Sequence, residues 1–66
     1  MYPNLEAERI RHGHTEEYVA EKLGITRQEY RQRTNSDSFL ESDVAALTKM
    51  YRKSFEYLFF QKERGR

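Results

Sequence analysis

The sequence predicts a small all-α protein, a compact bundle of about five short helices, on three grounds. The chain has 66 residues, which is too short for two domains that each bury a core. Few turn residues interrupt it, and Gly13 and Gly24 separate stretches of good helix formers. Several of these stretches begin with residues that cap helices. We therefore expect one helical domain over residues 1–60, followed by a charged tail over residues 61–66.

The first helix is expected to begin at Asn4, directly after Pro3, and to end at Gly13. Its residues favour helix, but the apolar ones, Leu5, Ala7 and Ile10, do not line one tight face. Helix propensity therefore supports this element more than periodicity does.

The second helix is expected between a cap at Thr15 and a stop at Gly24. Glu16 and Glu17 fall in its first turn, where carboxylates meet the positive end of the helix dipole. A buried stripe at helical spacing is predicted for Val19, Ala20 and Leu23.

The third helix has the clearest local signature. Thr26 and Glu29 have the spacing of a capping box, in which each side chain bonds the backbone N–H of the other residue. Only Gly24 and Ile25 separate this cap from the preceding helix, which predicts a tight, steeply angled helix-turn-helix.

Two further helices are expected in the second half of the chain. Residues 35–38 have the composition of a loop, and Ser38 with Glu41 predicts a second capping box. The buried face of this fourth helix would consist of Val44, Leu47 and Tyr51. Ser54 is expected to cap a short fifth helix with one face formed by Phe55, Leu58 and Phe59.

Residues 15–30 resemble the helix-turn-helix core of the Cro and phage-repressor family, the lambda-repressor-like class. That family has a small residue in its second helix, Gly at the turn and an apolar residue inside the third helix, which correspond to Ala20, Gly24 and Tyr30. Residues 54–59 are similar to the Ser-x-Asp-Tyr-Leu ending of these domains, and residues 1–5 resemble the opening of small phage and prophage Cro-like proteins. The resemblance implies a transcriptional repressor that binds double-stranded DNA.

The helix over about residues 26–35 would then enter the major groove. Base contacts are expected from its exposed face, which carries Arg27, Gln28, Arg31 and Gln32. By the same resemblance, Thr26 and Asn35 would lie nearer the DNA backbone. Charge supports this placement, because residues 26–35 carry +2 whereas residues 15–23 carry −2. Four positions are expected to have structural roles. Ala20 allows close helix packing, and Gly24 forms the turn. Ile25 and Tyr30 hold the third helix against the core.

Three residues depart from the family pattern: His14 and Arg33 where apolar residues are usual, and Glu16 where a phosphate-binding glutamine is frequent. We expect Arg33 to lay its aliphatic stem on the core and turn its guanidinium towards solvent, phosphate or a carboxylate, so that leucine would be tolerated there. A carboxylate near phosphate opposes DNA binding. Glu16 therefore keeps a second hypothesis open, a protein-interaction module such as an antirepressor or inhibitor.

The aromatic residues predict self-association. Nine Phe and Tyr side chains are more than a bundle of this size can enclose, and Phe59 and Phe60 point in different directions on a helix. One of them should remain exposed and contribute to a weak homodimer that reads an inverted-repeat operator.

Other classes of function find no support in the sequence. It has no cysteine, no phosphate loop and no Ser/His/Asp constellation, so we expect neither an enzyme nor a cofactor. His12 and His14 do not share a helical face, which argues against a metal site; one should be exposed and the other partly buried. The longest apolar run, residues 57–60, is too short to span a membrane, and a cytoplasmic location is expected.

Overall fold

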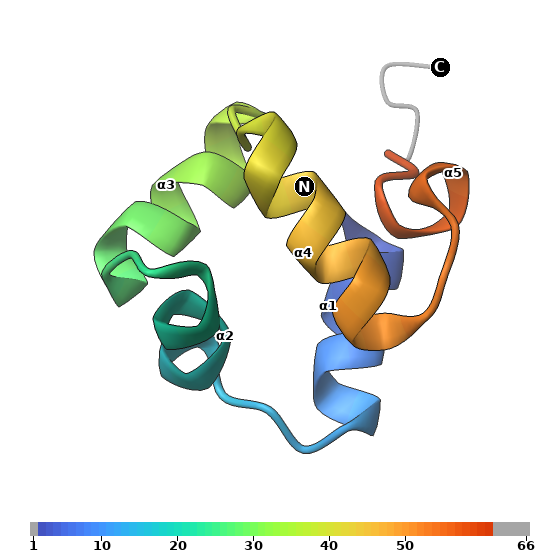
Figure 1. Cartoon of the computed structure of the whole chain (residues 1–66), viewed down its shortest axis with the longest axis horizontal. Coiled ribbons are helices and arrows are strands. Elements are labelled where there is room, and N and C mark those ends of the chain that lie inside the picture. Colours follow the sequence, from blue (N-terminus) through green and yellow to red (C-terminus); the bar gives the residue numbers. More distant parts are fainter. Residues whose placement is uncertain (1, 62–66) are drawn as a thin grey trace.

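A computed structural model describes residues 2–61, which form an all-α bundle of five helices and no strand (Figure 1). The predicted fold class is therefore confirmed. The helices are α1 (Pro3–Arg11), α2 (Glu16–Leu23), α3 (Arg27–Ser36), α4 (Glu41–Tyr51) and α5 (Phe55–Leu58). The predicted tail, apart from Gln61, lies outside the described residues.

Helix α1 begins one residue earlier than expected, at Pro3. Proline suits this position because the N–H that it lacks would have no partner in the first turn. The buried residues of α1 are Leu5 and Glu8, whereas Ile10 is 63% exposed. A carboxylate therefore takes a core position, which explains why the apolar residues alone do not mark the buried face.

Helix α2 begins and ends as predicted. The Thr15 hydroxyl accepts a hydrogen bond from the backbone N–H of Tyr18 at 3.0 Å. At the other end Gly24 has a φ of 75°, and the N–H of Ile25 donates to the Ala20 carbonyl at 3.0 Å. This left-handed closure ends the helix at low conformational cost because glycine has no Cβ.

Helix α3 begins with the predicted capping box. The Thr26 hydroxyl accepts from the N–H of Glu29 at 3.0 Å, and the Glu29 carboxylate accepts from the N–H of Thr26 at 2.9 Å. The helix extends through Ser36, so the loop expected from residue 35 begins later, at the left-handed Asp37.

The start of α4 differs from the prediction. Ser38 does not cap this helix; its N–H instead donates to the Arg33 carbonyl at 3.1 Å and closes the end of α3. Asp43 provides the cap of α4, because its carboxylate accepts from the N–H of Leu40 at 3.0 Å. Asp43 is also buried, and Val44, expected on the buried face, is only half-buried.

The core lies where α1, α2, α3 and α4 converge, and α5 closes one side of it (Figure 1). Ser54 caps α5 as predicted, by accepting from the N–H of Tyr57 at 3.1 Å. Phe59 packs edge-to-face on Tyr2, with ring centroids 5.1 Å apart, whereas Phe60 is 53% exposed. The expectation that one of the two final phenylalanines remains outside is confirmed. The buried apolar residues are Tyr2, Leu5, Val19, Ala20, Tyr30, Leu47, Tyr51 and Leu58.

Within residues 2–61, no helix combines the length and apolar character required to cross a lipid bilayer.

Candidate nucleic-acid interface

The α2–α3 pair holds the candidate surface in place. In Figure 1 the ribbon of α3 crosses the view, whereas α2 is seen more nearly along its axis. Ala20 is 1% exposed, and its small side chain allows close helix packing. Tyr30, also 1% exposed, anchors the inner face of α3, and half-buried Ile25 packs against the core from the turn. The positions assigned structural roles from the sequence are thus buried or at the turn as required.

The outer face of α3 carries the side chains expected to read bases, and all four of them are exposed: Arg27, Gln28, Arg31 and Gln32. They form two adjacent rows, because residues four apart lie above one another on a helix. One row contains the arginines and the other the glutamines. Thr26 and Asn35, expected near the DNA backbone, are exposed at the two ends of the helix.

Glu16 contacts both members of the arginine row. Its Oε1 atom lies 3.5 Å from the Nε of Arg27 and 3.6 Å from the Nε of Arg31. The Glu16 side chain is 25% exposed, whereas the two arginine side chains are 52% and 56% exposed. The carboxylate therefore offsets part of the positive charge on the candidate surface without covering it.

The sequence had indicated Glu16 as a residue near phosphate but not as a partner of these arginines. The sequence contains a signal that could indicate this pairing. Two arginines lie four residues apart on α3, and a glutamate lies in the first turn of α2, which packs against α3. The pairing could not be derived from spacing alone, because it depends on how the two helices cross.

Arg33 forms a largely buried ion pair. Its Nη1 atom lies 2.6 Å from Oδ2 of Asp43, with the two side chains 22% and 5% exposed. Of the three destinations expected for this guanidinium, the carboxylate is the one observed. The tolerance expected for leucine at this position no longer follows, because leucine would leave the Asp43 carboxylate buried without its cation.

The two histidines have the exposures predicted for them: His12 is exposed and His14 is half-buried. The Nδ1 atom of His14 lies 2.9 Å from the Tyr51 hydroxyl, and its ring packs on Tyr18 with centroids 4.4 Å apart. Desolvation, with smaller contributions from the positive charges of His12 and Lys22, lowers the pKa of His14. The polar His14 side chain is therefore accommodated at this half-buried position by packing among aromatic rings.

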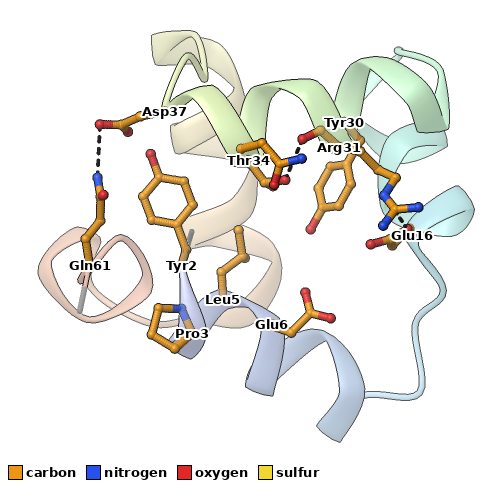
Figure 2. Close-up of a pocket in the computed structure, with 11 residues that line it drawn as sticks. Tyr2, Pro3, Leu5, Glu6, Glu16, Tyr30, Arg31, Thr34, Asp37 and Gln61 are labelled. Atoms are coloured by element: carbon orange, nitrogen blue, oxygen red, sulfur yellow. Dashed lines mark hydrogen bonds and ion pairs between the residues drawn. The ribbon is translucent and has the colours of Figure 1, made fainter. Parts of the chain in front are cut away.

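A cleft of about 720 Å³ lies between the start of α1 and the inner side of α3 (Figure 2). The Tyr30 ring reaches into it from α3, and Leu5 and Glu6 line it from α1. Arg31 and Glu16 stand at one end, so the cleft adjoins the arginine row of the candidate surface.

No protein-family model, curated protein or solved structure matches this chain.

Proposed function

We propose that this protein is a sequence-specific double-stranded DNA-binding regulator of transcription, of the Cro-like repressor kind, with α3 as its recognition helix. The observation that carries the proposal is the outer face of α3, where four side chains suited to base edges are exposed on a helix fixed by a capping box and by buried Tyr30.

The chemistry of the two rows suits the major groove. Arginine can donate two hydrogen bonds to guanine, and glutamine can bond adenine at two atoms, each pair giving roughly 1–3 kcal/mol of discrimination. Thr26 and Asn35, at the two ends of the helix, would contact the sugar-phosphate backbone and fix the register.

A symmetric pair of subunits would place two recognition helices about 34 Å apart, one turn of the duplex. The exposed aromatic rings at α5 support this arrangement. Phe55 and Phe60 are 54% and 53% exposed, and Phe55 stacks on Phe59 with centroids 5.4 Å apart. We expect weak self-association and an inverted-repeat operator.

The test is selection from random duplexes, followed by fluorescence-anisotropy titrations on selected and scrambled sites at several salt concentrations. Gln28→Ala and Gln32→Ala should each lose roughly 1–3 kcal/mol on the selected site and leave nonspecific binding nearly unchanged. Arg31→Ala should weaken binding and, if it contacts phosphate, reduce the salt slope by about one unit. Two outcomes would contradict the proposal: selection that enriches no sequence, or an enriched duplex that is bound no more tightly than its scrambled version.

The pairing of Glu16 with Arg27 and Arg31 favours a second candidate function, a protein-interaction module on the same scaffold. A surface that is partly neutralised attracts phosphate less strongly and suits a protein partner with mixed charge. Under this alternative, helix-α3 alanine variants would lose a protein partner in pull-downs, and the wild-type protein would prefer no duplex.

A further inference from the structure

Glu16 contacts the two arginines of the candidate surface at the same atom of each side chain. Its Oε1 atom lies 3.5 Å from the Nε of Arg27 and 3.6 Å from the Nε of Arg31, and a dashed line in Figure 2 marks the contact with Arg31. Nε is the inner nitrogen of the guanidinium, so these contacts do not use the outer pair, Nη1 and Nη2. Both arginine side chains are more than half exposed, which makes the outer atoms accessible to a ligand.

Glu16 belongs to a well-fixed part of the molecule. It is the first residue of α2, a helix that begins at the Thr15 cap and is anchored in the core by buried Val19 and Ala20. The carboxylate lies in the first helical turn, where the helix dipole favours a negative charge. A carboxylate held in this way restricts the side-chain conformations of both arginines.

Restricted arginines suit base reading more than phosphate binding. The contact with O6 and N7 of guanine uses two donors at once and therefore requires a defined orientation of the guanidinium. Attraction to phosphate comes mainly from charge and tolerates many orientations. Immobilising a long side chain on binding lowers affinity by a factor of about 2 to 10, and a side chain that is already positioned avoids part of this loss.

We propose that Glu16 is a positioning residue for base readout, which holds Arg27 and Arg31 so that the outer donors of each bind O6 and N7 of a guanine. This inference rests on the proposed function and names part of the operator. Residues four apart on a helix are separated by about 6 Å along its axis, whereas successive base pairs are about 3.4 Å apart. Each half-site should therefore contain two guanines no more than about two base pairs apart.

Two variants separate positioning from charge. Glu16→Asp keeps the negative charge on the same turn, but its carboxylate is one methylene shorter and no longer reaches both Nε atoms. Its affinity for scrambled duplex should stay near the wild-type value, while the ratio of affinities for selected and scrambled duplexes should fall about threefold. Glu16→Gln removes the charge, so at low salt the affinity for scrambled duplex should rise more than that for the selected one.

The ratio is a suitable readout because it compares two duplexes with one protein, so that any change in the folded fraction cancels. Glu17→Gln is the matched control, since it removes a neighbouring charge on the same turn and should leave the ratio at the wild-type value.

Modified bases test the guanine contacts directly. 7-Deazaguanine lacks the N7 acceptor and still pairs with cytosine, so it can replace each guanine of the selected duplex in turn. At two positions no more than about two base pairs apart, it should weaken binding of the wild-type protein about fivefold. The loss at one position should disappear in Arg27→Ala and the loss at the other in Arg31→Ala.

The outcomes distinguish this inference from the function on which it rests. A wild-type protein that binds selected and scrambled duplexes equally would remove the proposed function, and this inference with it. A wild-type protein that prefers its selected duplex, combined with an unchanged ratio in Glu16→Asp or with no effect of 7-deazaguanine, would overturn the positioning role and leave the proposed function standing.

Discussion

The helix-turn-helix and the part of the molecule built from α1, α4 and α5 are stabilised in different ways. In α2 and α3, each cap joins residues three apart, such as Thr15 with Tyr18 and Thr26 with Glu29. The other part also has local caps, at Asp43 and Ser54, but a polar contact between distant residues is added to them: the Tyr57 hydroxyl donates to buried Glu8 at 3.0 Å, across 49 positions. The first region is therefore specified locally, and the second depends on the whole fold.

In so short a chain, paired carboxylates occupy core positions that apolar side chains would otherwise fill. Glu8 and Asp43 occupy core positions at 1% and 4% exposure. Each carboxylate has an arginine partner and at least one further hydrogen bond. Buried charges of this kind are tolerated when paired, and loss of one partner is costly. The part with long-range polar contacts should thus be more sensitive to mutation than the exposed face of α3.

The largest expected effect comes from Arg33→Leu. The change leaves the Asp43 carboxylate buried, and among residues 2–61 the N–H of Leu40 is then its one remaining hydrogen-bond partner. We expect a loss of about 2–4 kcal/mol in the free energy of unfolding, somewhat below a fully buried pair because Arg33 is partly exposed. Urea denaturation followed by circular dichroism measures this loss.

Arg31→Leu is the matched control, since it makes the same change two residues earlier on the same helix. The Arg31 side chain is 56% exposed and its pair with Glu16 is weak, so we expect a change within about 0.5 kcal/mol. If Arg33→Leu were as stable as Arg31→Leu, the buried pair of Arg33 with Asp43 would contribute no stability.

The next effect is expected for Tyr57→Phe, which removes the hydroxyl that donates to Glu8 and keeps the ring. A hydrogen bond to a buried charged group is lost, so unfolding should become easier by about 1–2 kcal/mol. Tyr18→Phe, at a side chain that is 39% exposed, should be nearly neutral. Equal melting temperatures for the two variants would show that the Glu8 contact contributes little.

The same contrast explains what the sequence could predict. The fold class, the caps at Thr15, Thr26 and Ser54 and the turn at Gly24 follow from neighbouring residues, and each of them is observed. The cap of α4 was predicted wrongly because two local patterns compete there. Ser38 has cap chemistry, but closure of α3 uses its N–H, and Asp43 performs the capping.

For the candidate site, too, features set by neighbouring residues could be predicted and contacts between helices could not. Which α3 residues are exposed follows from helical periodicity, given that Tyr30 is buried. The contacts of Glu16 with Arg27 and Arg31, and the cleft beside Tyr30, depend on how helices pack. No short-range pattern encodes such packing, so the pairing of Glu16 with the two arginines could be derived only from the structure.

A smaller effect is expected on DNA binding from Glu16→Gln. Removal of the carboxylate frees both arginines and takes a negative charge away from the duplex, so affinity should rise about 3- to 10-fold at low salt. Anisotropy titrations at several salt concentrations measure it, and Glu17→Gln, exposed on the same turn, should give a smaller rise. Unchanged affinity in Glu16→Gln would mean that the arginine row does not face DNA.

The smallest effect concerns His14, which joins the two regions through its contact with Tyr51. The groups that face it are His12, Lys22 and the rings of Tyr18 and Tyr51, and its pKa lies below the ordinary 6.5, chiefly through desolvation. Because the unfolded chain binds the proton more readily, His14 contributes stability above about pH 6.5 that is lost as the pH falls through the lowered folded pKa. Urea unfolding at about pH 7.5 and about pH 5 should show a larger acid-induced loss for the wild-type protein than for His14→Gln. The comparison between the two proteins cancels acid effects that do not involve His14. Equal losses would show that His14 titrates alike in the folded and unfolded chains.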